Sequence, residues 1–393
     1  MFYHLPLFLQ KTESMNLPDY FEPVDFTATT SGANPLGKYS LGPEIEKNTQ
    51  KFVQTNLAKT DVVIFGVPVE NGEPQKNGTP DKIRRALYKL AAFNNNLTIA
   101  DLGNLKPATS VKGTFLALRD VVEYIRELDV VAVILGGSQD LTTGICEAFK
   151  NERFFWLATV DCVLDVKKRT EKFNSTNYLT RIFKNLPNLF HFSLIGYQNH
   201  LVGEKLMSQT KGIGEHLRLG QLRDDFTNAE LLLRNANVLS FDMGAIKFTD
   251  APSTPQKNPN GLRSDEACQL ARYAGLSAKL SVFGLFNMFE NIKTDSCTTI
   301  NLGAEIIWYF LEGIAGRTIP GEKTIYKVAI DGLEQPVIFR HEEETNRWWF
   351  EVQSVSGETF EVACTQQDYK EAAGNEVPGR WLKFVQKMDG LSK

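Results

Sequence analysis

The chain has 393 residues, of which 42% are hydrophobic and 11% aromatic, and it carries a formal net charge of -4. This apolar content is enough for one large α/β domain with an appendage, or for two domains. The mild acidity, with a pI near 5.9, gives no reason to expect nucleic acid or an anionic membrane surface as a partner. Lys and Arg are scattered along the chain, which indicates a solvated surface.

The cysteines and histidines exclude several kinds of site. Five cysteines stand at wide spacing without a C-x-x-C, and five histidines show neither H-x-x-x-H nor H-E-x-x-H spacing. This pattern argues against a disulfide framework, a thiolate zinc site and zinc hydrolases of those local types. Cysteines without a disulfide pattern fit a reducing compartment, so we expect the protein to be cytoplasmic.

The first residues show no targeting signal of the usual kind. The opening "MFYHLPLFLQ" contains Pro6 and lacks a basic start and a small-residue cleavage site, so it is a poor signal peptide. We expect the first fourteen residues to be an upstream extension. No apolar run reaches the length of a membrane span, and we expect no membrane insertion.

From Asp61 onward the pattern alternates between strands and helices. Apolar, β-branched runs predict strands that are buried on both faces, at residues 61–68, 96–103, 130–137, 154–161, 189–198, 237–244 and 280–290. Helical periodicity predicts helices at residues 79–93, 115–128, 177–186, 227–236, 264–278 and 298–316. Alternation of this length predicts an α/β fold with a mainly parallel, doubly wound sheet.

The composition changes near residue 318, where "IYKVAID", "PVIFRHEE" and "RWWFEVQSV" predict short strands joined by turns. We therefore predict three parts. Residues 1–60 form an N-terminal extension and lead-in, residues 61–318 the α/β domain, and residues 319–393 a small β-rich C-terminal appendage. Trp348, Trp349 and Trp381 are expected in the core of the appendage, or, if a subset is exposed, in a patch that contacts another protein.

Polar residues follow three of the predicted strands, at the edge where open parallel sheets bind ligands. "LGGSQDLT" comes directly after the apolar run "VVAVIL". "VDCVLD" places Asp161 and Asp165 just past a strand, and "LSFDMGAIKFTDAP" places Asp242 at a strand end and Asp250 farther along. Carboxylates at neighbouring strand ends raise one another's pKa unless a cation or a basic side chain neutralises them.

In this order, the blocks resemble the arginase, agmatinase and formimidoylglutamase (ureohydrolase) family, from about Asp61 to Arg317. "LGGSQD" stands where the family has G-G-D-H, "VDCVLD" where it has D-A-H-x-D, and "SFDMGAIKFTDAP" where it has S-x-D-x-D-x-x-D-P. "GVPVENGEPQKNGTPDKIRRAL", "ADLGNL" and "NGLRSDEACQLARYAGL" resemble three further family elements. The likeness is greatest to a divergent group of formimidoylglutamases that share "RYAGLS" and a tail similar to "RWWFEV…DYKEA…VPGRW".

The resemblance implies a three-layer α/β/α fold and two Mn²⁺ ions, held by two histidines and four aspartates. Together the ions activate a bridging hydroxide that attacks an amidine or guanidine carbon. Of these ligands, Asp161, Asp165 and Asp242 are retained in this sequence. The two histidines are replaced by Gln139 and Val163.

Two further family positions also differ. The second aspartate of S-x-D-x-D is Gly244, and the glutamate after the last strand aligns with Asn287, with Glu290 three residues later. Asp250 is a candidate for the final aspartate, although the loop before it is longer than the family's.

The remaining donors make a weak metal site. Three carboxylates and Gln139 form an all-oxygen set, which suits Mg²⁺ or Ca²⁺ better than paired Mn²⁺. We expect no cofactor, or Mn²⁺ or Mg²⁺ at low occupancy on a vestigial site of Asp161, Asp165 and Asp242. In the structural alternative, the two aspartates of "VDCVLD" cap a helix or bond loop amides, and Gln139 donates hydrogen bonds to the carboxylates.

The sequence supports three hypotheses for function. In the first, the protein is a pseudoenzyme that binds a protein or a small ligand. In the second, it hydrolyses a linear amidine, formimidoylglutamate or a guanidino compound, with one metal. In the third, the appendage mediates assembly, since family members are often oligomers. Expected partners are therefore another protein, bound through the appendage, and further copies of this chain.

Overall fold

The computed structural model describes residues 15–27, 34, 36–49, 54–70, 73–74, 79–94, 97–108, 110–167, 171–210, 212–288, 296–317, 321–354 and 357–390. Its strands are β1 Phe21–Glu22, β2 Glu46–Lys47, β3 Val62–Gly66, β4 Val69–Glu70, β5 Glu73–Pro74, β6 Ile99–Leu105, β7 Val131–Leu135, β8 Phe155–Val160, β9 Leu189–Tyr197, β10 Gly214–Arg218, β11 Val238–Asp242, β12 Val282–Phe286, β13 Lys323–Val328, β14 Val337–Glu342, β15 Arg347–Gln353 and β16 Thr359–Cys364. Its α-helices are α1 Leu17–Tyr20, α3 Thr79–Leu87, α4 Val111–Glu127, α5 Thr142–Glu147, α6 Tyr178–Asn185, α7 Glu204–Met207, α8 Leu219–Asp224, α9 Thr227–Leu233, α10 Ser264–Gly275, α11 Ser296–Ala315, α12 Gln366–Ala373 and α13 Gly379–Gly390.

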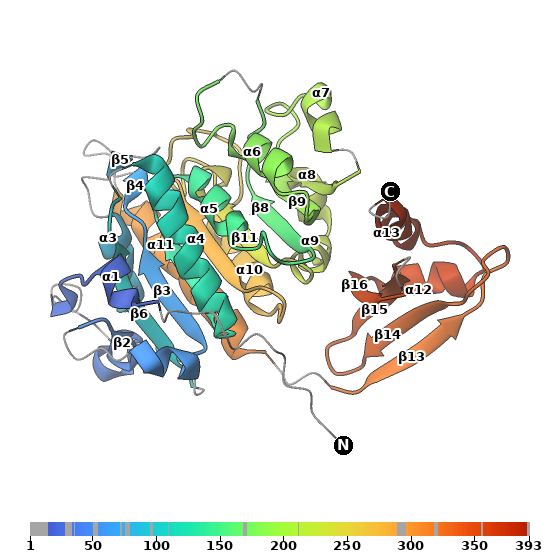
Figure 1. Ribbon diagram of the computed structural model, residues 1–393, viewed down its shortest axis with the longest axis horizontal. Coiled ribbons are helices and arrows are strands. Elements are labelled where there is room, and N and C mark those ends of the chain that lie inside the picture. The colour runs from blue at the N-terminus through green and yellow to red at the C-terminus, as the bar shows by residue number, and fades with distance from the viewer. Residues whose placement is uncertain are drawn as a thin grey trace.

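A ten-stranded sheet forms the centre of the molecule (Figure 1). Its order is β1-β6-β3-β7-β12-β11-β8-β9-β10, with β2 also paired to β6. The strand pairs are parallel except for β1 with β6. The predicted mainly parallel sheet is therefore confirmed. Six of the seven predicted strand segments contain one of its strands, and the segment 96–103 overlaps β6.

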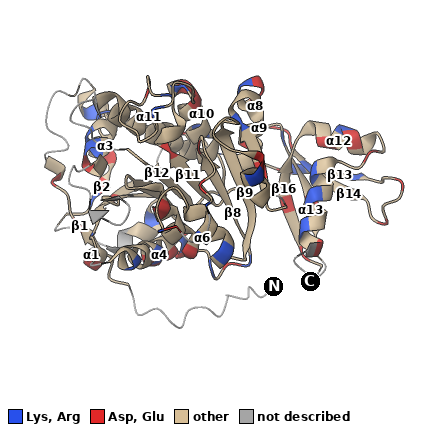
Figure 2. Cartoon of the chain, turned by 90° about the horizontal axis from the view of Figure 1, so that it is seen from above, with Lys and Arg blue, Asp and Glu red and all other residues tan. Residues whose placement is uncertain are grey.

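Helices cover both faces of this sheet, as Figure 2 shows from above. Helices α3, α8, α9, α10 and α11 bury their apolar residues on one face, and α1, α4, α5 and α6 on the other. Successive side chains of a strand point to opposite faces. In β3, accordingly, Val62 and Ile64 enter the first core, and Val63 and Phe65 the second. The three-layer α/β/α architecture is confirmed.

Some elements of the sheet have little sequence signal. The strands β1 and β2 are two residues long, and β10, with the sequence "GEHLR", is polar and lies at the edge of the sheet. The strands β1 and β2 also add residues 21–22 and 46–47, from the predicted lead-in, to the central sheet. Among the helices in the part of the chain that the structure describes, none is long and apolar enough to cross a membrane.

The C-terminal part forms a separate antiparallel sheet in the order β13-β14-β15-β16, accompanied by α12 and α13. Its core holds Phe339, Trp348, Phe350 and Phe384, and it also takes in Phe190 of β9. The tail is thus β-rich as predicted, but it also contains two helices and shares its core with the edge of the central sheet. Trp349 is buried in a small cluster with Leu231 and Ala363, and Trp381 is half-buried.

Candidate functional site

The polar residues of interest follow four strands that are neighbours in the central sheet, β7, β12, β11 and β8. Gln139 comes shortly after β7, Asn287 directly after β12, Asp242 ends β11 and Asp161 directly follows β8. Because these strands are parallel, their carboxyl ends meet at one edge of the sheet. The fold therefore brings together side chains that are up to 148 residues apart in the chain.

Two glycines make the turn that positions Gln139. Gly136 and Gly137 have φ angles of +78° and +80°, a backbone region that favours glycine. A Cβ atom on Gly137 would lie 2.8 Å from the carbonyl oxygens of Val67 and Val69. The glycines of "LGGSQD" are thus required by their backbone conformation and by the close approach of the chain.

Three aspartates form a buried acidic cluster, which we define as Asp161, Asp165 and Asp242. Their exposed fractions are 2%, 8% and 2%. Burial is the main cause that raises their pKa values, to about 8 for Asp165 and about 6 for Asp242, and well above the usual range for Asp161. At Asp161, the charges of Asp242 and Asp165 add to the effect of burial on the pKa. The charged form of this carboxyl is therefore disfavoured in the cluster.

Gln139 supplies hydrogen-bond donors to the acidic cluster. In the amide orientation that satisfies both of its ends, Nε2 lies 3.0 Å from Asp161 Oδ2 and 3.2 Å from Asp242 Oδ2. The amide oxygen then accepts from Tyr178 Oη at 3.1 Å and from Ser240 Oγ at 3.3 Å. A fully buried glutamine is therefore bonded at both ends, and its NH₂ group joins two of the three carboxyls.

Asn287 supplies a second amide. Its Nδ2 donates to Asp242 Oδ2 at 2.9 Å, and its Oδ1 accepts from the backbone N–H of Gln139 at 3.1 Å. The other oxygen of Asp242, Oδ1, accepts from the N–H of Gly244 at 2.6 Å. Asp242 is thus surrounded by neutral donors, which partly offset the effect of burial on its pKa.

Tyr178 and Ser240 belong to the same network and were missed in the sequence. Tyr178 begins α6 and is fully buried, and burial followed by the charge of Asp165 raises its pKa well above the usual value. Ser240 Oγ lies 2.7 Å from Thr142 Oγ1. No local motif marks Tyr178. Ser240 is the first residue of the "SFDMGAIKFTDAP" block, but its contacts in the network depend on distant strand ends.

The other predicted site residues lie at or outside the margin of this network. The backbone N–H of Val163 donates to Asp161 Oδ1 at 3.0 Å, but its apolar side chain offers no ligand. Asp250 accepts from Ser264 N and Oγ, both at 3.0 Å, and so bonds the start of α10 rather than the acidic cluster. Glu290 lies outside the described residues.

The donor set does not fit a pair of Mn²⁺ ions. The amide N–H groups of Gln139 and Asn287 point at the carboxylate oxygens that would have to face the cations. Within the described ranges, no group of three or more His, Cys, Asp or Glu side chains is placed to hold a metal ion. The chemistry that this arrangement supports is hydrogen bonding of amide and backbone donors to buried carboxyls.

Comparisons with known proteins agree with the fold. The model of the arginase family matches residues 60–312. The formimidoylglutamase of Citrobacter koseri is 29% identical over 138 residues, which cover 33% of this chain and 44% of that protein. The formimidoylglutamase of Salmonella typhi is 26% identical over a segment of the same length. The chain thus spans less than half the length of these curated relatives.

Solved structures are similar over more of the chain. A crystal structure of Trypanosoma cruzi formiminoglutamase with Mn²⁺ matches with a TM-score of 0.61 and 18% identity, covering 69% of this chain and 97% of that one. The formimidoylglutamase from Bacillus subtilis matches with a TM-score of 0.59 and 15% identity, covering 73% and 100%. At these identities the likeness supports the three-layer fold.

Proposed function

Since the chain belongs to the arginase family, we propose that it is a formimidoylglutamase-like protein whose binuclear metal site is degraded. In this proposal it acts by binding a ligand or a partner, and it does not hydrolyse amidines efficiently. The curated relatives named above are formimidoylglutamases, which are hydrolases. Under this proposal, the chain lacks the efficient hydrolysis of those relatives.

One observation carries the proposal. In the orientation that satisfies both ends of its amide, Gln139 donates from Nε2 toward Asp161 and Asp242, at the position where the family resemblance places a histidine ligand. An amide nitrogen in this orientation competes with a cation for the same carboxylate oxygens, and it has no free electron pair to offer a metal. The neutral amide thus takes the place that a cation would need.

The chemical consequence concerns the attacking water. Two shared cations lower the pKa of a bound water enough to form hydroxide near neutral pH. In the acidic cluster the carboxyl oxygens instead accept hydrogen bonds from Gln139, Asn287 and Gly244. These neutral donors do not lower the pKa of a water, so such a cluster provides no metal-bound hydroxide.

The test is metal content together with activity. Full-length protein is dialysed against MnCl₂, passed through a desalting column and analysed by plasma mass spectrometry. We expect well under two Mn²⁺ ions per chain, and no formamide or urea from formimidoylglutamate or arginine. Two tightly bound ions with release of either product would overturn the proposal.

A second candidate function is hydrolysis of a linear amidine with a single metal. The retention of three buried aspartates at adjacent strand ends favours it, because carboxylate oxygens are the ligands that hard divalent cations prefer. This candidate predicts one ion per chain and formamide release that is lost in Asp242→Asn. Protein that binds no ion and forms no product would rule it out.

A further inference from the structure

A cavity separate from the acidic cluster lies where α13 packs against the edge of the central sheet. The amine of Lys387 lies 3.1 Å from Phe190 O, 2.8 Å from Ile213 O and 2.8 Å from His191 Nδ1. These contacts tie α13 to the start of β9 and to the residue before β10. Lys387 is thus fully used in fastening the helix.

A second connection lies about two turns earlier in α13. Arg380 Nη1 donates to both oxygens of Glu215, at 2.8 and 2.7 Å, and His191 Nε2 lies 3.4 Å from Glu215 Oε2. Although burial acts in the opposite direction, His191 and Arg380 bring the pKa of Glu215 down to about 2. Burial lowers the pKa of His191 to about 4, so the imidazole is neutral at pH 7. The charge of Glu215 is therefore matched by Arg380.

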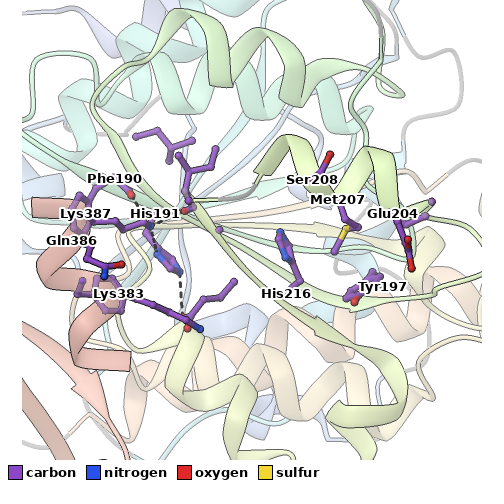
Figure 3. Close-up of a pocket in the computed structure, with 18 of the residues that line it drawn as sticks. Phe190, His191, Tyr197, Glu204, Met207, Ser208, His216, Lys383, Gln386 and Lys387 are labelled. Carbon is purple, nitrogen blue, oxygen red and sulfur yellow. Dashed lines mark hydrogen bonds and ion pairs between the residues drawn. The ribbon is translucent and has the colours of Figure 1, made fainter. Parts of the chain in front are cut away.

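The cavity beside these contacts has a volume of about 1210 Å³. Figure 3 shows it between Lys383, Gln386 and Lys387 of α13 at one end and Glu204, Met207 and Ser208 at the other. Apolar side chains form much of its wall, among them Leu189, Phe190, Val202, Met207, Ile213 and Phe384. Small-molecule sites in proteins are concave and mostly apolar, with a few placed polar groups, and this cavity has that character.

Basic residues of α13 lie on one side of the cavity. Arg380, Lys383 and Lys387 are spaced i, i+3 and i+7 along α13, which places them on one face of the helix. Figure 2 shows blue Lys and Arg positions along α13. Arg380 is paired with Glu215, whereas the side chain of Lys383 is exposed and makes no hydrogen bond or ion pair with the residues that the structure describes. Its charge also lowers the pKa of Glu215, but no carboxylate is in direct contact with it. Lys383 is thus an exposed cation at the cavity.

We propose that this cavity binds a small organic anion with an apolar body. Its carboxylate or similar group would lie beside Lys383, and its apolar body against Phe190, Phe384 and Met207. This proposal rests on the binding role proposed above and gives that role a location and a ligand class. It involves none of the aspartates of the acidic cluster.

The far end of the cavity sets the orientation of the ligand. Glu204 begins α7, is exposed and lines the cavity opposite α13. A carboxylate is repelled there, so the apolar or a cationic end of the ligand is favoured beside α7. Electrostatic complementarity of this kind gives specificity more than affinity.

The test is calorimetric titration of the full-length protein with octanoate, compared with octan-1-ol and octylamine. We expect octanoate to bind at one site per chain and more tightly than the other two. The variant Lys383→Glu should weaken octanoate binding roughly fivefold, in line with one partly exposed charge contact. Met207→Trp, which fills the cavity without a charge change, should also weaken it.

The matched control is Lys370→Glu, which makes the same charge change on the exposed surface of α12, outside the cavity. It should leave octanoate affinity within about twofold of wild type. No octanoate binding to the wild-type protein, equal weakening by both lysine variants, or equally tight octylamine binding would each overturn the proposal.

Metal content measured on the same preparations keeps the two proposals apart. Octanoate binding in protein that holds two Mn²⁺ ions per chain would refute only the degraded metal site. Metal-free protein that does not bind octanoate would refute only the anion site.

Discussion

The acidic cluster and the α13 cavity differ in what occupies them. In the acidic cluster, amide donors from Gln139 and Asn287 bond two of the three buried carboxyls, Asp161 and Asp242, and occupy the space between the strand ends. In the α13 cavity, the polar groups hold the walls in place and leave about 1210 Å³ between them. The first region is closed by hydrogen bonds, and the second is kept open by them.

Under the proposed function, this difference is the way in which the fold is kept while its use changes. The strand ends still converge, because the parallel sheet and the glycine turn depend on backbone geometry and not on metal ligands. The α13 cavity exists because a helix from the C-terminal part packs on the edge strand β10. In the proposed binding role, the position of the organic anion thus depends on which surface the C-terminal part leaves accessible.

The strongest way to break the comparison is to remove a donor from the acidic cluster. Gln139→Glu replaces the NH₂ group with an oxygen that faces Asp161 and Asp242. We expect a loss of about 3 kcal/mol in the free energy of unfolding, measured by urea denaturation, because a buried carboxylate loses its donor and gains a like charge. The control Gln221→Glu, on the exposed surface of α8, should change stability by less than about 0.5 kcal/mol. Equal stability of both variants would contradict the described network.

A second variant attempts to reopen the site to metal. The triple change Gln139→His, Val163→His and Gly244→Asp introduces the residue types that the family resemblance places there. A Cβ atom at position 244 would meet Gln256 Cγ at 2.7 Å, and this flexible side chain can move. We expect Mn²⁺ affinity to rise about tenfold or more in calorimetric titrations, since imidazole and carboxylate are good Mn²⁺ and Zn²⁺ ligands.

The control for this gain is Gln221→His, which adds an imidazole far from the strand ends. If the triple variant binds Mn²⁺ no better than that control, the loss of these three residues does not explain the weak metal site.

A smaller effect is expected from pH at the α13 cavity. Burial, with the charge of Arg380 and against that of Glu215, lowers the pKa of Lys387 to about 7. Above pH 7 the amine is neutral in the folded protein but charged in the unfolded chain up to its ordinary pKa of 10.5. The unfolded state then binds more protons, so Lys387 makes stability rise with pH between 7 and 10.5.

Lys387→Met should remove that rise. We expect the stability gain between pH 7 and pH 9 to be about 1 kcal/mol smaller than in wild type, measured by urea denaturation at each pH. His191 and Glu215 also face this amine, but they titrate below pH 7 and do not contribute in that window. Lys370→Met should follow the wild-type curve. A Lys387→Met curve with the wild-type slope would contradict the buried position of the amine.

Much of the architecture could be predicted because its signals are local. Apolar runs such as "VVAVIL" are buried on both faces in any parallel sheet, and each predicted strand segment contains or overlaps a strand. The approach of Asp161 and Asp242 followed from the same reasoning, since parallel strands end at one edge. The small antiparallel sheet of the tail was also predicted from its strand pattern.

Other features left too little local signal. The strand β10 is short and polar, and the helix α13 was not predicted although Arg380, Lys383 and Lys387 recur at helical spacing. The hydrogen bonds of Tyr178 and Asn287 to the network depend on distances between strands far apart in the chain. A sequence pattern reports the burial of a residue, but not which distant group it contacts.

The sequence by itself determined the strand and helix alternation, the family, and the absence of two imidazoles from the positions that need them, because these are properties of residue type and order. Only the tertiary structure decided that an amide joins Asp161 to Asp242, and that the tail packs on β10 beside a cavity. Those outcomes depend on the directions of individual side chains and on contacts across nearly two hundred residues. The packing of the whole chain determines these contacts, and no short stretch of sequence specifies them.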